Sequence, residues 1–304
     1  MSAPTIIPTI PANLPRQISI TYATALSRGA LVFTQTASVT PIPVGSSTFN
    51  LRYCPSLANK PTAPNPDTLT VLPNPFLPPF APLLVASLPG YNIVLNRFPV
   101  VAHHFLLCTS EFEPQSTPLR DADVKMVYRV LESWAGDKKL FGFFNCGERS
   151  GASQPHRHVQ FFPVANSKEM LYDQCPEAPA APAMEDRRGS RDMSVQPAPW
   201  VHPGVPFKSY CFRIKSEDEA VHAYKRLMET AAEILDRNEG SYNLGVTKEW
   251  MVLLPRTQAE VDWVGINGTV LAGEVMVKRE EEWDVFTDEG ALEKALKQIG
   301  VPQE

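Results

Sequence analysis

Proline is the feature of this sequence that most restricts its fold. The chain of 304 residues contains 30 prolines against 16 glycines, and much of the proline falls in two segments, residues 54–84 and 175–206. Proline fixes the backbone angle φ and lacks an N–H donor, so it is excluded from helix interiors and central strands. Both segments are therefore predicted to be loops. The first, rich in Leu and Phe, is expected to pack against the body, and the second, polar and mixed in charge, to be mobile.

The sequence around these loops alternates between helix-like and strand-like patterns. Helices are expected at 14–28, 124–134, from the Ser216/Glu219 capping box onward, and at 290–300. Strands are expected at 30–35, 47–54, 91–98, 104–110, 139–145, 156–163, 208–214, 249–256 and 273–278. This order predicts an α+β fold, a mostly antiparallel sheet flanked by helices with long proline-rich loops. Residues 1–165 are predicted to form an N-terminal half, 166–206 a mobile loop, and 207–304 a C-terminal half that completes the same fold.

The net charge, the apolar runs and the cysteines indicate which partners and which cellular location to expect. A net charge of -5 argues against nucleic acid as the main partner. No apolar run approaches about 18 residues, so no membrane partner is expected. The N-terminus lacks the pattern of a signal peptide. Five scattered cysteines without a C-x-x-C pair indicate free thiols in a reducing compartment. The expected location is the cytoplasm, with the nucleus as the alternative.

Residues 145–163, "NCGERSGASQPHRHVQFFP", hold two of the chain's 6 histidines one residue apart. In a strand, alternate side chains share a face, so His156, His158, Gln160 and Phe162 are expected to point the same way. Three interpretations compete. The histidines are incidental on a surface strand, or they are two ligands of a metal site, or one is the nucleophile of phosphoryl or nucleotidyl transfer.

The preceding loop favours the third interpretation. "GERSGASQ" offers small residues whose backbone amides can face an anion, with Ser150, Ser153 and Gln154 as side-chain donors. It lacks the G-K-[ST] of a Walker loop. A zinc site needs further ligands, whereas the remaining histidines are scattered at 103, 104, 202 and 222.

"SGASQPHRHVQFFP" resembles the H-x-H-x-Q signature of the transferase branch of the histidine-triad superfamily. Further segments extend the resemblance over most of the chain, to the fungal diadenosine tetraphosphate phosphorylases, also called ATP adenylyltransferases. These segments are "FNLRYCPSLANKP", "YNIVLNRFPVVAHHFLLCTSEFEPQ", "YNLGVTKEWMVLLPR" and "INGTVLAGEVMVK". The histidine motif alone also fits galactose-1-phosphate uridylyltransferases; the flanking segments fit the phosphorylases better.

The resemblance implies a histidine-triad-like fold and a set of site residues. His158 would be the nucleophile, Gln160 would contact the transferred phosphoryl group, and His156 would orient its neighbour. The implied nucleotide- and phosphate-binding residues are Lys60, Asn96, Arg97, Asn145, Gly151, Ala152, Ser153, Gln154, Asn267, Gly268, Thr269 and Lys278. The chain departs from the family pattern at Arg97, where Lys is frequent, and at Glu274, where an apolar residue is common.

The implied reaction is cleavage of diadenosine tetraphosphate by inorganic phosphate into ADP and ATP, through an AMP–histidine intermediate. A divalent cation, expected to be magnesium, would come with the substrate, and no tightly bound cofactor or protein metal site is expected. Two alternatives stay open. One is a uridylyltransferase, which structural zinc would favour, and the other is a nucleotide-binding sensor without turnover.

Overall fold

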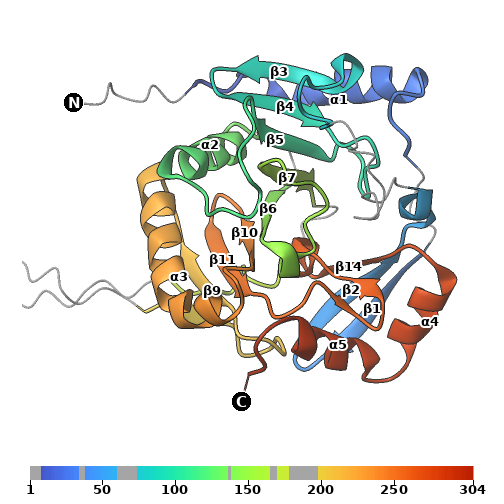
Figure 1. Ribbon diagram of the computed structural model, residues 1–304, viewed down its shortest axis with the longest axis vertical. Coiled ribbons are helices and arrows are strands. Elements are labelled where there is room, and N and C mark those ends of the chain that lie inside the picture. Colours follow the sequence, from blue (N-terminus) through green and yellow to red (C-terminus); the bar gives the residue numbers. More distant parts are fainter. Residues whose placement is uncertain are drawn as a thin grey trace, which may run out of the picture.

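A nine-stranded sheet forms the centre of the protein in the computed structural model, which describes residues 8–33, 38–59, 74–135, 138–164, 170–177 and 198–303 (Figure 1). Each neighbouring pair of strands is antiparallel. In spatial order the strands are β3 (Leu84–Leu88), β4 (Tyr91–Leu95), β5 (Phe105–Thr109), β7 (His158–Pro163), β6 (Leu140–Cys146), β10 (Tyr242–Val246), β11 (Trp250–Pro255), β9 (Tyr210–Arg213) and β8 (Trp200–Val201).

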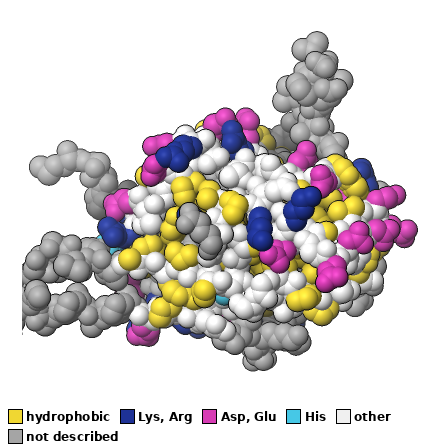
Figure 2. Space-filling view, turned by 90° about the horizontal axis from the view of Figure 1, so that it is seen from below, with side chains coloured by type: hydrophobic (Ala, Val, Ile, Leu, Met, Phe, Trp, Pro, Cys, Tyr) yellow, Lys and Arg dark blue, Asp and Glu magenta, His cyan; other side chains and the backbone are white. Residues whose placement is uncertain are grey.

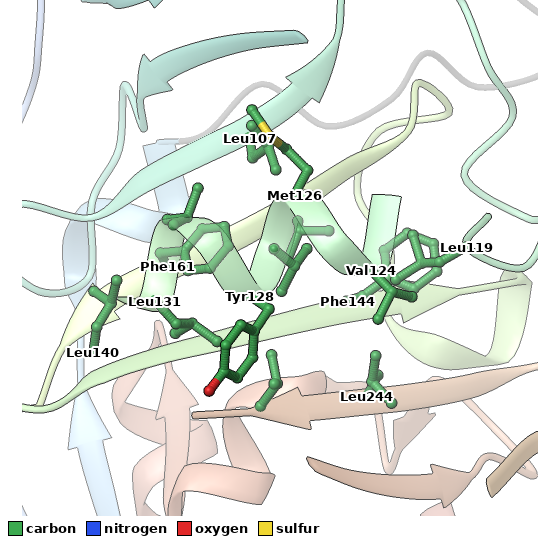
Figure 3. Close-up of a cluster of buried hydrophobic side chains, with 14 of the residues drawn as sticks. Leu107, Leu119, Val124, Met126, Tyr128, Leu131, Leu140, Phe144, Phe161 and Leu244 are labelled. Carbon is green, nitrogen blue, oxygen red and sulfur yellow. The ribbon is translucent and has the colours of Figure 1, made fainter. Parts of the chain in front are cut away.

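Three helices cover one face of this sheet: α1 (Leu14–Ser27), α2 (Asp121–Glu132) and α3 (Glu217–Arg237). Figure 3 shows the cluster that joins α2 to the sheet, with Val124 and Leu131 of the helix against Phe144, Phe161 and Leu244 of three strands. Alternate residues of each strand enter this cluster because successive side chains point to opposite faces. Val159 and Phe161 therefore pack under α2, while His158 and Gln160 belong to the other face.

The other face carries a second layer (Figure 1). It contains a three-stranded sheet, two helices and a short strand pair. Their bounds are β1 (Ser38–Val44), β2 (Ser47–Tyr53), β14 (Glu274–Val277), α4 (Glu280–Thr287), α5 (Ala291–Ile299), β12 (Glu260–Val261) and β13 (Val264–Gly265). Strand β14 runs parallel to β2, and the other pairs are antiparallel. The predicted α+β fold with a mostly antiparallel sheet is confirmed.

Short 3-10 helices connect several of these elements: η1 (Pro55–Asn59), η2 (Ala81–Leu83), η3 (Glu148–Ser150) and η4 (Gly268–Ala272). In the nine-stranded sheet, the two predicted halves of the chain meet at the β6–β10 pair, in which Asn145 lies opposite Asn243, and in the second layer they meet at the β2–β14 pair. Of the predicted mobile loop 166–206, residues 166–169 and 178–197 lie outside the described residues.

The strand predicted at 30–35 is wrong where it can be assessed. Residues 30 and 31 close the end of α1 instead: the backbone N–H groups of Ala30 and Leu31 both donate to the carbonyl of Ala25, at 2.9 and 3.3 Å. The N–H of Val32 then donates to the carbonyl of Arg97, at 2.9 Å. Residues 34–37 are outside the described part of the chain.

Strand β1, which contains Pro41 and Pro43, was not predicted. Both prolines are tolerated because β1 is an edge strand that pairs only with β2. Strands β3 and β10 and helix α4 were also not predicted.

No helix among the described residues is long and apolar enough to cross a membrane. On the face drawn in Figure 2, basic side chains are scattered singly or in small groups among acidic and hydrophobic ones.

Candidate active site

The main sheet opens at the point where the histidine motif enters it. Strands β6 and β7 pair only as far as Phe143 and Gln160. Beyond that pair, the side chain of Gln115 fills the gap between the separating backbones. Its Nε2 donates to the carbonyls of Asn145 (2.8 Å) and His158 (3.2 Å), and its Oε1 accepts from the N–H of His158 (2.8 Å). Gln115 therefore fixes the backbone that carries His158 while leaving room for the loop 147–157.

His158 is buried, with 3% of the residue's surface exposed. Its Nδ1 lies 2.8 Å from the carbonyl oxygen of His156. A carbonyl can only accept, so Nδ1 carries the proton of the neutral ring and the lone pair is on Nε2. This is the tautomer that a nucleophile acting through Nε2 requires.

His156 is fully buried and is held at both ring nitrogens. Nδ1 lies 2.9 Å from Nδ2 of Asn74, and Nε2 lies 2.9 Å from both Oγ1 and the carbonyl of Thr109. Burial lowers the pKa of His156, outweighing the nearby backbone carbonyls that raise it. The side chain is thus a neutral, fixed support whose own carbonyl sets the tautomer of His158.

A chain of hydrogen bonds fixes the amide of Gln160. The backbone N–H of Phe98 donates to Oδ1 of Asn96 (3.0 Å), so Asn96 turns its Nδ2 toward Nδ1 of His104 (3.4 Å). Nδ1 then accepts, and the proton on Nε2 of His104 is donated to Oε1 of Gln160 (3.1 Å). The oxygen of the Gln160 amide is therefore occupied, and its NH₂ group remains to meet a ligand.

Beside this chain lies a cavity of about 200 Å³ between the main sheet and the second layer. It collects residues from both predicted halves of the chain. Of the predicted site residues, Asn96, Gly151, Ser153, Gln160, Asn267, Thr269 and Lys278 line it. The lining also includes Leu57, Phe98, Val100, His104, Phe143, Gly265, Met276 and Glu282.

The other predicted site residues do not line this cavity. His158 lies two residues along β7 from Gln160 on the same face, about 7 Å away. Asn145 and Gly268 are buried and are not among the lining residues, and Ala152 and Gln154 belong to the loop that carries Gly151 and Ser153. Arg97 is exposed and stacks over the ring of Phe98 at 5.6 Å. Lys60 lies outside the described residues.

A buried arginine ties together the two loops that border the cavity. Arg256 donates to five oxygens, the carbonyls of Ser150, Gln258, Ile266 and Ile299 and Oδ1 of Asn243. Burial lowers the pKa of its guanidinium to about 9, and the surrounding oxygens favour the charged form at neutral pH. The loops at 150–154 and 266–269 are thereby held at a fixed separation.

The same network orients Asn145. Its Oδ1 accepts from Nδ2 of Asn243 and from the backbone N–H of Gly268, both at 2.9 Å. What Asn145 can offer a ligand is therefore its NH₂ group. Only glycine fits at 268, because an added Cβ would lie 2.7 Å from this Oδ1.

The carboxylate of Glu274, a residue that departs from the family pattern, has polar partners within the second layer. Its carboxylate lies 3.0 Å from Nη2 of Arg52 and also accepts from Nδ2 of Asn50 (3.1 Å). Burial raises the pKa of Glu274, and the Arg52 charge opposes that rise.

The described residues bring no three His, Cys, Asp or Glu side chains together in a way that would hold a metal ion. The ring nitrogens of His156 are occupied by Asn74 and Thr109, so the H-x-H pair is not arranged as two metal ligands.

Two family models together account for nearly the whole chain. Residues 5–185 match the model described as the Ap4A phosphorylase N-terminal domain, and residues 203–302 match that of the ATP adenylyltransferase C-terminal domain. The chain belongs to the Ap4A phosphorylase family. Among curated relatives, Diadenosine 5',5'''-P1,P4-tetraphosphate phosphorylase 2 of Saccharomyces cerevisiae is 31% identical over 96% of both chains. Protein APA1 of the same yeast is 28% identical over 96% of both.

Solved structures of the Ap4A phosphorylase family share the fold. The structure of yeast Ap4A phosphorylase Apa2 in complex with AMP superposes with a TM-score of 0.81 at 27% identity, covering 97% of this chain and 99% of that one. The structure of Apa2 in complex with Ap4A gives a TM-score of 0.79 at the same identity, over 97% and 100%.

Sequence reasoning missed several residues that build this Ap4A phosphorylase site. Gln115, Asn243 and Arg256 carry no motif, and their roles depend on strand register. His104 was considered only as a scattered candidate metal ligand. The detectable signal was its place as the first residue of the strand predicted at 104–110, in a segment already carrying the family resemblance.

Proposed function

We propose that this protein is an ATP adenylyltransferase that cleaves diadenosine tetraphosphate with inorganic phosphate, yielding ADP and ATP. The observation that carries the proposal is the Nδ1–H bond from His158 to the carbonyl of His156, which leaves the Nε2 lone pair as a nucleophile beside Gln160. Family membership supports the substrate, since both a relative's name and its complex with Ap4A identify that dinucleotide.

In the first step, Nε2 of His158 attacks the α-phosphorus of one AMP unit. The bond from that phosphorus to its bridging oxygen breaks, and ATP leaves with the bonding electrons. The NH₂ groups of Gln160 and Asn145 are the donors for charge on the phosphoryl oxygens and the phosphate chain. His156 acts as a positioning residue through its carbonyl.

In the second step, an oxygen of inorganic phosphate attacks the same phosphorus. The N–P bond breaks, ADP leaves, and His158 returns to its neutral tautomer. A glutamine amide can donate a hydrogen bond but cannot supply a proton at neutral pH, so Gln160 suits leaving groups that need little protonation. Lys278 and the 150–154 loop would hold the phosphate acceptor close to the adduct.

A divalent cation, magnesium by its preference for phosphate oxygens, would enter bound to the polyphosphate. The protein would then donate hydrogen bonds to the phosphate oxygens that the cation does not bind. Neither alternative gains a specific supporting observation: a uridylyltransferase would be favoured by a zinc site, and a sensor by a disrupted His158 or Gln160.

The test is to trap the adduct. Protein incubated with diadenosine tetraphosphate labelled in the α-phosphate, without inorganic phosphate, should carry label on His158. The phosphoramidate bond should be labile in acid and stable in base. His158→Ala should abolish both the label and phosphorolysis, whereas His222→Ala, on the exposed side of α3, should not. Label on another residue, or no label in an active preparation, would contradict the mechanism.

A further inference from the structure

A segment of the first proline-rich loop is bound directly to the histidine motif. Oδ1 of Asn74 accepts from the backbone N–H of Phe76 at 3.0 Å, so its NH₂ group is turned toward Nδ1 of His156, 2.9 Å away. Nδ1 then acts as an acceptor, and the proton on Nε2 of His156 is donated to the carbonyl of Thr109. Asn74 therefore fixes both the ring of His156 and the backbone that carries Phe76.

The ring of Phe76 packs against both histidines of the motif. Its centroid lies 5.5 Å from that of His156, with the ring planes at 86°, and 5.4 Å from that of His158, with the planes at 44°. Both separations are in the range at which aromatic rings attract each other. One side chain of the proline-rich segment therefore contacts the nucleophile and also the residue whose carbonyl sets its tautomer.

Phe76 rests on an apolar patch that shares a face of the main sheet with His158. Cys108 lies opposite His158 in the β5–β7 pair, and residues that lie opposite each other point to the same face. Leu106, two residues along β5, shares that face, and Val94 lies opposite Leu106 in the β4–β5 pair. Phe76, which is 6% exposed, forms a buried cluster with these three side chains. Its ring is therefore held from below as well as by its own backbone.

The imidazole of His158 needs a second point of contact. The hydrogen bond from its Nδ1 to the carbonyl of His156 fixes one atom, and by itself would let the ring pivot about that bond. Attack at phosphorus requires the lone pair on Nε2 to point at the phosphorus atom, in line with the bond that breaks. A ring packed against the imidazole limits this pivoting, and the ring of Phe76 is in that position.

We propose that Phe76 is a positioning residue for the reaction, which holds the plane of the His158 imidazole so that Nε2 faces the phosphorus. The inference rests on the proposed function, because it assigns a support to the nucleophile of that function. Phe76 is not among the residues that line the cavity, so its contribution goes through His158 and not through binding of the nucleotide.

The experiment follows labelled adduct on His158 during the first turnover, with an excess of diadenosine tetraphosphate labelled in the α-phosphate and no inorganic phosphate. The amount of adduct counts the competent molecules, and the rate constant for its formation reports how well Nε2 is aimed. Affinity for AMP is measured by titration calorimetry, and Tm is measured on each variant.

The test variant is Phe76→Leu, which keeps an apolar side chain in the cluster and removes the ring. Its rate constant for adduct formation should fall about tenfold, while the Kd for AMP stays within about twofold of wild type. Phe76→Tyr keeps a ring and should recover most of the wild-type rate constant. Phe80→Leu is the matched control, because Phe80 is 53% exposed in the same segment, and it should change neither quantity.

The inference and the proposed function can fail separately. A wild-type rate constant in a folded Phe76→Leu protein that forms the adduct would overturn the inference and leave the proposed function intact. A loss of AMP affinity as large as the loss of rate would also overturn it, since Phe76 would then act on nucleotide binding. Equal losses in Phe76→Leu and Phe80→Leu would assign the effect to the segment and not to the ring. If the active wild type formed no adduct, the proposed function would fall, and the inference with it.

Discussion

Removing the imidazole of His104 tests whether the orientation of Gln160 matters to the reaction. In His104→Ala, Oε1 of Gln160 loses the donor at 3.1 Å that holds it away from the cavity. The amide can then rotate and present its oxygen to the phosphoryl group, where it repels the developing charge. The expected result is a lower kcat for phosphorolysis, with the KM for the dinucleotide within about twofold of wild type.

The size of the effect follows from the hydrogen bonds involved. A typical hydrogen bond contributes about 1 kcal/mol net, so losing the one from His104 should lower kcat by about fivefold. The upper limit is set by Gln160→Ala, which deletes a hydrogen bond to a charged group worth about 1.5–3 kcal/mol, or roughly 10- to 150-fold. Because His104 acts only through Gln160, adding His104→Ala to Gln160→Ala should cost nothing further.

The assay is the phosphate-dependent formation of ADP and ATP from diadenosine tetraphosphate, with Tm measured on each variant. His104→Gln retains an N–H donor and should recover part of the rate. His103→Asn is the matched control, because position 103 has a left-handed backbone (φ 64°) that asparagine tolerates. Additive losses in the double variant, or equal rates for His104→Ala and wild type, would refute the reasoning.

Three further outcomes are expected. Gln160→His should shift products from ADP toward free AMP, because imidazole can pass protons to and from water, and an unchanged ADP-to-AMP ratio would place acceptor choice around Ser153 and Lys278. Arg256→Met leaves five oxygens without their donor and should destabilise the protein by about 3–5 kcal/mol in urea unfolding, whereas Arg237→Met, at an exposed ion pair, should cost less than about 1 kcal/mol. Burial raises the pKa of Asp123, but hydrogen bonds from Arg120 and Tyr91 outweigh it and leave the pKa below its usual value. The stability from Asp123 should therefore be present above about pH 4 and be lost as the pH falls below it, and Asp123→Asn should flatten that part of the stability–pH curve.

The sequence was most informative where a pattern reflects local physics. Alternation predicted the strand that carries His158 and Gln160, and the 3.6-residue period predicted α2 and α3. The sequence patterns failed where contacts with another segment of the chain decide the local structure. Pro41 and Pro43 are compatible with a strand only because β1 is at an edge, and Ala30 and Leu31 bond back to the end of α1.

The residues of the site also divide into those that local sequence predicts and those whose role depends on contacts formed by folding. The histidine motif and its loop are contiguous, so their residues could be named in advance. Gln115 and Arg256 could not, because each acts through partners far away in the sequence. His104 and Gln160 lie on neighbouring segments of the sheet, and only the β5–β7 register brings them together.

The β6–β10 pair has a consequence for how the protein is made. Every residue of β6, Leu140–Cys146, is buried in the finished sheet, yet its partner on one side is β10, Tyr242–Val246. During synthesis on the ribosome, β6 therefore leaves the exit tunnel long before that partner exists. Until then it is an apolar edge strand with unsatisfied backbone groups, the kind that pairs with other chains. Nascent chains stalled or truncated before residue 242 should be aggregation-prone clients of chaperones, whereas the completed chain closes this edge with its own C-terminal half.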